Sequence, residues 1–253
     1  MATPSASAFL DELEFLAAVE HALVIDHLTI HAALGHDMDP AEPGQVGERV
    51  REAAGAAFNI AMGEMNHLRR ATSALSAAGR RPRVDRAPSI RVASGTDVTL
   101  GRPSSSELAG LVERERLVAA AVDVRWAALC RALASAEPLV DGDALEQVRF
   151  ALEPCIEHSG STKTIADLLD GVSSEQFLRV TRREAGDDVE RSLLAVGDAR
   201  YALVLALVRA WLGHDELAGD MRGPAIDAMG ALNEFDRTLA ERGLLPAFTL
   251  PPA

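Results

Sequence analysis

The chain has 253 residues, of which 48% are hydrophobic and 25% are charged, and its formal net charge is −13. This balance is typical of a globular protein and excludes a disordered or fibrous class, while the negative charge would repel nucleic acid and anionic membrane surfaces. Aromatic residues make up only 4%, and Ala and Leu dominate the apolar part, which favours closely packed helices over sheets.

Two long helices are predicted in the first third of the chain. Apolar residues recur at helical spacing over 7–34, and a glycine follows directly. Pro43 stands in the first turn of a second helix that reaches residue 78, and a glycine again follows it. Over 80–103 the helical pattern gives way to Arg, Pro, Ser and Gly with two short β-branched stretches, which predicts a long crossover loop.

Four more helices are predicted in the rest of the chain. Ser104 to Ser106, followed by Glu107, is typical of an N-cap and opens the third helix. Pro154 and Gly160 stand inside the fourth helix and indicate a kink or a bulge there. The helices expected in this part of the chain run over 104–134, 144–169, 188–212 and 224–242.

The order of these elements predicts an all-α fold. Two long helices, a long crossover and two more long helices are typical of a four-helix bundle with one long connection. We expect a single domain over 1–253, with a core bundle at about 7–172 and additional C-terminal helices at about 175–245.

Glu64 and His67 are the first candidate site residues. They are three residues apart in the second predicted helix, so their side chains lie on one face and can converge on one metal ion. Apolar residues surround the pair and place it on or beside the buried face, where an ionised carboxylate needs a cation nearby. A buried Glu–His hydrogen bond accounts for the spacing equally well, so the motif alone leaves both interpretations open.

The first predicted helix adds one carboxylate and two imidazoles. Glu20 stands within an apolar run, His27 lies two turns further along the same face, and His31 follows one turn later. One inward Glu beside a Glu-x-x-His helix is the recurring half-site of di-iron and di-manganese carboxylate bundles. The alternative is that the histidines only line a polar seam of the bundle.

Residues 16–34 and 57–82 resemble the ferritin-like family, and more narrowly the ferritin-like domain of iminophenylpyruvate dimer synthases from bisindole biosynthesis. The stretches that carry the resemblance are AVEHALVIDHLTIHAAL, AMGEMNHLRRATSALSAAGRRP and, near the end of the chain, LAERGLLPAFTLPP. The resemblance implies a ferritin-like four-helix bundle in which Glu20, Glu64 and His67 are metal ligands.

The opposite half of the site is less complete. The third helix offers Glu115 and Asp123 on its apolar side, and we take Glu115 as the metal ligand there. On the fourth helix Glu157 and His158 are the candidate ligands, but adjacent residues lie about 100° apart around a helix and share a face only if the helix is distorted. The sequence therefore leaves open whether the site holds two metal ions, one or none.

Further polar side chains are expected around these ligands. His27, His31 and Asp123 are predicted either to orient a ligand through a hydrogen bond or to act as additional ligands. His27 stands where many ferritin-like proteins carry a Tyr near the metal.

The resemblance favours a non-haem iron oxidase or oxygenase, with one or two irons, that acts on a small metabolite in secondary metabolism. Its partners would be dioxygen and a small-molecule substrate, and its cofactor iron (Fe2+/Fe3+), with manganese as the alternative, because carboxylates and imidazole suit both metals. The other interpretation is a catalytically degenerate ferritin-like binding or scaffold protein with an incomplete site and no cofactor. Whether the chain is an enzyme is open at this stage.

Location and assembly are only weakly constrained. The chain opens without a basic segment followed by an apolar stretch, and its longest apolar run, Tyr201 to Val208, is far shorter than the about 20 residues that a membrane-spanning helix needs. We therefore expect a cytoplasmic protein with no membrane or nucleic-acid partner. A homodimer is one assembly that the sequence leaves open.

Overall fold

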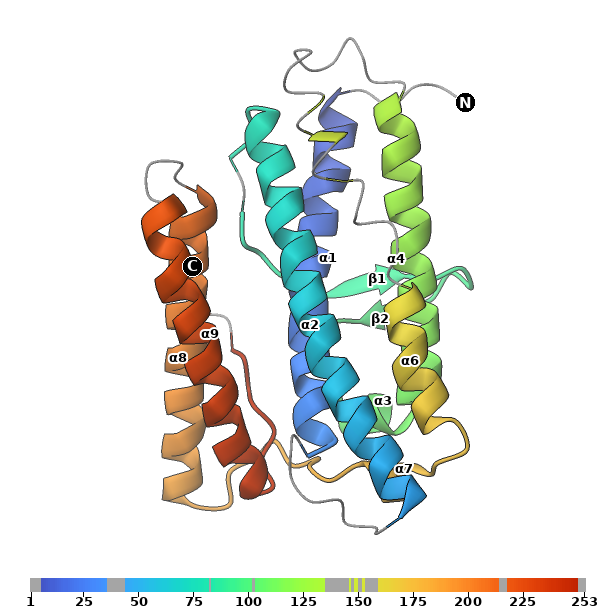
Figure 1. Cartoon of the computed structure of the whole chain (residues 1–253), viewed down its shortest axis with the longest axis vertical. Coiled ribbons are helices and arrows are strands. Elements are labelled where there is room, and N and C mark those ends of the chain that lie inside the picture. Colours follow the sequence, from blue (N-terminus) through green and yellow to red (C-terminus); the bar gives the residue numbers. More distant parts are fainter. Residues whose placement is uncertain are drawn as a thin grey trace.

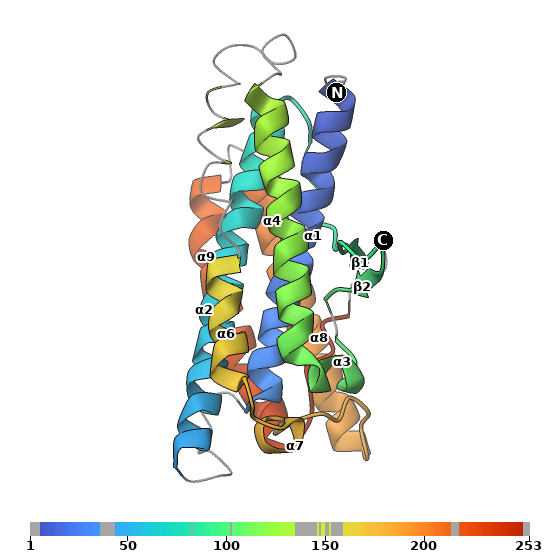
Figure 2. The same ribbon diagram turned by 90° about the vertical axis from the view of Figure 1, so that its right-hand side faces the viewer.

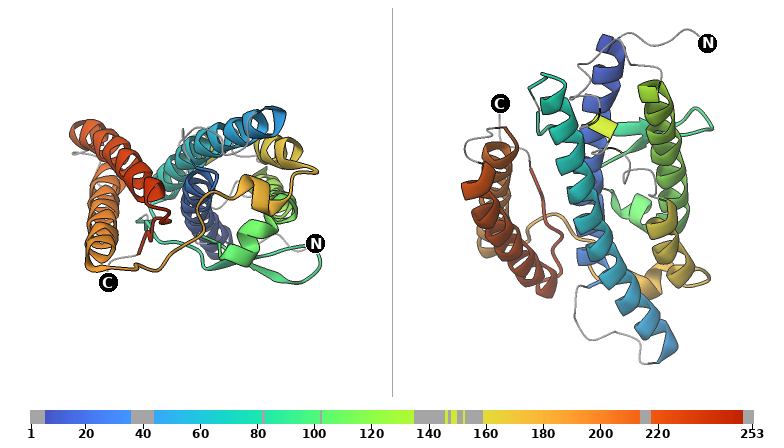
Figure 3. Two further views of the ribbon diagram at one scale, coloured as in Figure 1. Left: turned by 90° about the horizontal axis from the view of Figure 1, so that it is seen from below. Right: turned by 45° about the horizontal axis from the view of Figure 1, so that its top comes forward.

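The computed structural model describes most of the chain, and the described part is mainly helical, as the sequence predicts. The helices α1 (Ala6–Ala33), α2 (Gln45–Ala77), α4 (Leu111–Ala134) and α6 (Ser159–Leu169) lie side by side (Figure 1). Seen end-on, they surround a common interior, and a pair of further helices stands on one side (Figure 3). The residues described are 6–35, 44–81, 83–101, 103–134, 146, 148–149, 152, 159–213 and 218–249.

The first two helices begin and end close to their predicted limits. Gly35 and Gly79 follow α1 and α2 with φ angles of 96° and 73°, in the left-handed region that glycine adopts without strain. The helix therefore stops where the backbone turns left-handed. Pro43 lies outside the described residues, and α2 begins two positions after it, at Gln45.

The crossover contains more regular structure than the sequence predicts. Strands β1 (Ser89–Arg91) and β2 (Asp97–Thr99) form an antiparallel hairpin in which Ile90 is paired with Val98. Figure 2 shows this hairpin beside α1 and α4. Ile90 is buried in the same hydrophobic cluster as residues of both helices, so the β-branched stretches close one side of the bundle.

The third predicted helix is divided in two, so the expectation of one helix over 104–134 was wrong. Ser104 caps α3 (Ser105–Ala109): its hydroxyl accepts from the Glu107 N–H at 3.2 Å, and Glu107 accepts from the Ser104 N–H at 2.7 Å. Gly110 then interrupts the helix, because glycine has little helical preference, and α4 begins at Leu111.

The C-terminal helices are α7 (Ser174–Phe177), α8 (Asp188–Gly213) and α9 (Ala218–Glu241), and the last two form an antiparallel pair beside α1 and α2 (Figure 1). The predicted start of α9 at Pro224 was wrong. Pro224 lies in the second turn, where its missing N–H removes only the bond to the carbonyl of Asp220, and the helix tolerates that loss. In the predicted fourth helix, α6 covers only the second part, and Pro154 lies outside the described residues.

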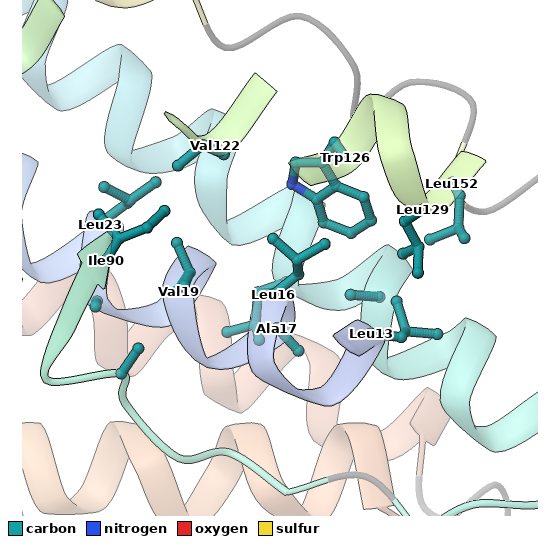
Figure 4. Packing of buried hydrophobic residues seen from close by; sticks show 14 of the residues in the cluster. Leu13, Leu16, Ala17, Val19, Leu23, Ile90, Val122, Trp126, Leu129 and Leu152 are labelled. Carbon is teal, nitrogen blue, oxygen red and sulfur yellow. The ribbon is translucent and has the colours of Figure 1, made fainter. Parts of the chain in front are cut away.

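The main core fills the space between α1, α2, α4 and the hairpin. Figure 4 shows Leu16 of α1 and Trp126 of α4 within this cluster, and both are fully buried. A second cluster fills the opposite end of the bundle, and a third joins Ile25 of α1 to the inner faces of α8 and α9. In the part of the chain that is described, no helix is both long and apolar enough to cross a membrane.

Candidate metal centre

Two carboxylates and one imidazole converge between α1 and α2. The ligand atoms of Glu20, Glu64 and His67 all lie within 4.8 Å of one another, and we call these three residues the triad. Both carboxylates are buried, and the His67 side chain is only 17% exposed. The i,i+3 spacing on α2 and the antiparallel packing of α1 against it place the three groups at one level of the bundle, as the helical pattern predicts.

His67 lies between the two carboxylates. Its Nδ1 donates to Glu64 Oε2 at 3.0 Å, while Glu20 Oε2 lies 3.6 Å away, which is an ion-pair distance rather than a hydrogen bond. Burial alone would lower the pKa of His67, but the contacts and charges of Glu20 and Glu64 outweigh burial and raise the pKa to about 9. The imidazole is therefore protonated at neutral pH and is a positive partner for the two acids.

Trp126 of α4 fixes the orientation of Glu20. Its indole Nε1 donates to Glu20 Oε1 at 2.6 Å, and the ring is fully buried. The sequence pattern did not single out this residue. The available signal was its position one turn beyond Val122 on the apolar stripe, since a buried indole N–H needs an acceptor.

A second polar cluster lies further along α1. His27 Nδ1 donates to the Leu23 carbonyl at 2.9 Å, and Nε2 lies 2.9 Å from Glu115 Oε2. Burial alone would lower the pKa of His27, but the charge and hydrogen bond of Glu115 raise it to about 9. For the Glu115 carboxyl, burial alone would raise the pKa, but the charges of His27 and Arg114 and the hydrogen bond with His27 outweigh burial and lower the pKa. Both shifts indicate an imidazolium–carboxylate pair.

Arg114 connects this pair to another buried acid. Its guanidinium donates to Glu115 Oε1 at 3.2 Å and to Asp26 Oδ2 at 2.7 Å, and Asp26 Oδ1 also accepts the backbone N–H of Gly101 at 2.8 Å. Burial raises the pKa of Asp26, and the Arg114 charge opposes that rise. We call Asp26, His27, Arg114 and Glu115 the ion-pair network; all four are buried.

The structure separates the predicted site residues into two groups. Glu115 and His27, predicted as a ligand and as its neighbour, bind each other in the ion-pair network and lie outside the triad. His31 is one turn further on, where its Nδ1 donates to the Ala54 carbonyl at 2.9 Å. Asp123 is half-buried on α4 and is also outside the triad.

Two predicted ligands, Glu157 and His158, lie outside the described residues. The network also contains two residues that the sequence pattern did not single out, Asp26 and Arg114. In the sequence, Asp26 stands next to His27 and Arg114 stands next to Glu115. Nothing in the sequence indicates that residues 88 positions apart come into contact.

His21 shows that a histidine next to a triad residue can have a purely structural partner set. Its Nδ1 donates to the Asp85 carbonyl at 2.8 Å, and Nε2 lies 2.9 Å from the Tyr201 hydroxyl. Burial lowers its pKa to about 4, so the ring is neutral and Nε2 accepts the hydroxyl proton. His21 points away from Glu20 towards α8.

The donor set of the triad fits a divalent cation. Carboxylate oxygen and imidazole nitrogen are ligands of iron, manganese and zinc, with ligand distances of about 2.0–2.2 Å for zinc. Atoms that share such an ion lie at most about 4.4 Å apart, twice that distance. The observed limit of 4.8 Å is only slightly larger, so small side-chain rotations suffice to bring the three groups onto one ion.

The comparisons support the fold. Neither a protein-family model nor a curated protein matches the chain. Among solved structures, a ferritin-like protein from Caulobacter vibrioides is similar over 98% of this chain and 100% of its own, with a TM-score of 0.64 and 11% sequence identity. At that identity the likeness establishes the fold alone: the chain has a ferritin-like all-α fold.

Proposed function

We propose that this chain is a ferritin-like metalloprotein that binds one divalent metal ion, iron first and manganese as the alternative, through Glu20, Glu64 and His67. The observation that carries the proposal is the convergence of two buried carboxylates and an imidazole within 4.8 Å. The activity proposed for this centre is the oxidation of a small metabolite by dioxygen, in line with the resemblance to the ferritin-like domain of iminophenylpyruvate dimer synthases.

The side chains of the site have distinct tasks in this proposal. Glu20 and Glu64 supply negative charge in a buried setting, where a cation is bound more strongly than in water. Trp126 holds one oxygen of Glu20 and so limits its rotation. His67 has to release its proton before it can act as a ligand, so binding of the cation and loss of that proton are coupled. Bound iron would supply one-electron redox chemistry and affinity for dioxygen.

A single metal ion is favoured over two because of the way Glu115 is held. In carboxylate bundles with two metals, a Glu from each of two helices joins two Glu-x-x-His pairs. Here the Glu115 carboxylate is held by His27 at 2.9 Å and by Arg114 at 3.2 Å. Glu115 is thus already neutralised by two buried cationic side chains, which makes it less available to a second metal.

The test is the reaction of the iron-loaded protein with oxygen. Wild-type protein is loaded anaerobically with ferrous iron and exposed to dioxygen, and oxygen uptake and visible absorbance are followed. We expect uptake in the wild type and in Glu52→Gln, which alters an exposed acid of the same helix, and none above background in Glu64→Gln. Equal uptake in all three proteins would contradict the proposal.

The ion-pair network also favours a second candidate, a binding or scaffold protein with a degenerate site. Its acids are balanced by Arg114 and His27 without any metal, so this part of the bundle needs none to fold. Wild-type protein that holds only a trace of iron after anaerobic reconstitution would support this candidate and exclude the oxidase.

A further inference from the structure

A pocket is lined by residues of α1 and α2 and of the α8–α9 pair. Figure 1 and Figure 3 show this pair of helices beside the α1–α2 layer. The volume of the pocket is about 210 Å³, and we call it the outer pocket. The triad is not among its lining residues, so it is a separate site from the candidate metal centre. Most of its wall is apolar, for example Ile25, Leu28, Val204 and Leu205.

The size and lining of the outer pocket limit what it can hold. An apolar cavity of about 150 Å³ in a protein core stays dry and binds benzene. At about 210 Å³ the outer pocket has room for one substituted ring or two small fused rings. Met62, Met65 and Met229 contribute to the wall, and methionine adapts its shape to a ligand more readily than branched side chains do.

Few polar groups in the wall are available to a ligand. His21 and Tyr201 line the outer pocket, but they bond to each other. Asn233 of α9 also lines it, but its side-chain Oδ1 is fully buried, so a donor the size of water does not reach that oxygen from the pocket. The outer pocket therefore selects a ligand by shape and apolar contact.

The mouth of the outer pocket is open and apolar. Met62 of α2 and Ile226 of α9 line it and are 45% and 48% exposed, although side chains of this size are usually more deeply buried. Gly230 lies in the same wall in the interior of α9, and a Cβ built there would meet no atom within 4 Å. Glycine is unfavourable inside a helix, and here its missing side chain leaves the entrance wider.

We infer that the outer pocket is a binding site for a compact apolar molecule of one or two rings. The apolar wall accounts for affinity and the volume for the size limit. The inference is independent of the proposed metal function, since it involves none of the triad residues.

Two probes of equal size test the inference on the full chain without added metal. 4-Methylphenol and 1,4-dimethylbenzene differ only in a hydroxyl that replaces a methyl group. Binding is measured by the rise in Tm with ligand concentration and by NMR titration, since a ligand of the folded state alone raises its stability. We expect both to bind, with 1,4-dimethylbenzene bound about three- to tenfold more tightly, because the hydroxyl of the phenol gives up hydrogen bonds to water and finds no partner in the wall.

Variants locate the binding. Gly230→Phe, which places a ring at the mouth, should weaken both probes at least about tenfold, the effect of about 1.4 kcal/mol. Gly223→Phe is the matched control, because Gly223 is also in α9 with open space around it but does not line the outer pocket.

Three results would overturn the inference. The first is that neither probe changes the Tm or the spectra of the wild type at millimolar concentration. The second is that Gly230→Phe binds both probes as the wild type does, or that Gly223→Phe weakens them equally. The third, which removes selection by apolar contact, is tighter binding of the phenol than of 1,4-dimethylbenzene in the wild type. Unliganded Tm values establish that each variant is folded.

Discussion

The triad and the ion-pair network are built from the same kinds of side chain, yet their charges add up differently. The network contains two carboxylates, a guanidinium and an imidazolium, so its formal charges sum to zero. The triad contains two carboxylates and one imidazolium, so its three side chains sum to −1. Both groups are largely buried, where charge balance matters most.

The difference suggests different roles for the two clusters. In the network, the charges of the four side chains cancel one another. Its hydrogen bonds connect α1 to α4 and to the crossover and so stabilise their packing. The triad gathers negative charge around a point that three ligand atoms can share. In this chain the cluster with excess negative charge is therefore the candidate metal centre, and the balanced cluster is the structural element.

The largest expected effect comes from removal of the cation that balances the network. Arg114→Met leaves Asp26 and Glu115 buried without their guanidinium, and loss of one partner from a buried ion pair costs about 3–5 kcal/mol. Urea unfolding followed by circular dichroism measures the loss. Arg116→Met, at an exposed neighbouring position, is the control and should change stability by less than about 1 kcal/mol. Equal effects of the two changes would contradict a structural network.

The second prediction concerns pH. The folded pKa of His27 is raised from 6.5 to about 9, so the folded state binds its proton more tightly than the unfolded chain. The resulting stabilisation is complete below about pH 6.5 and is lost as pH rises through about 9, and it amounts to about 3 kcal/mol. Unfolding free energies at several pH values from 6 to 10, compared between wild type and His27→Gln, measure it. Parallel curves for the two proteins would show that His27 has no such role.

The third prediction concerns Trp126, which contacts the triad from α4. Trp126→Phe keeps an aromatic ring in the core but removes the N–H that Glu20 accepts at 2.6 Å. We expect a loss of about 1–2 kcal/mol in stability and an affinity for metal lowered about tenfold, since groups that orient a ligand have effects of this size. Urea unfolding and a manganese titration measure the two quantities. Unchanged metal affinity would remove Trp126 from the site.

The triad could be foreseen from the sequence because it depends mainly on helical spacing. Glu64 and His67 are one turn apart, and Glu20 lies in an apolar run, so the packing of two long helices against each other suffices to bring them to one level. The Ser104 cap was likewise visible, because a capping box is a local pattern. The roles of Glu20, Glu64 and His67 as metal ligands stay a prediction.

The network could not be foreseen, because it depends on long-range register. Asp26 meets Arg114 only through the way α4 packs against α1, and its other oxygen is bound by Gly101, a backbone group of the crossover. Apolar periodicity placed Glu115 inward, but it does not tell whether an inward acid meets a metal, a histidine or an arginine. The break at Gly110 was missed because a single glycine is often tolerated within a helix.

The smallest expected change in stability belongs to the triad itself. Without metal, Glu64→Gln removes one of two neighbouring carboxylates, so relief of repulsion offsets the lost ion pair with His67, and stability should change by about 1 kcal/mol or less. The same change should abolish metal binding. A loss as large as that of Arg114→Met would mean that the triad, too, is a structural element.

We expect the triad to bind a cation and the ion-pair network to bind none. Iron per chain after anaerobic dialysis, measured for the wild type, Glu64→Gln and Glu115→Gln, tests it most directly. We predict about one iron in the wild type and in Glu115→Gln and only a trace in Glu64→Gln. A trace of iron in the wild type, or loss of iron in Glu115→Gln equal to that in Glu64→Gln, would contradict it.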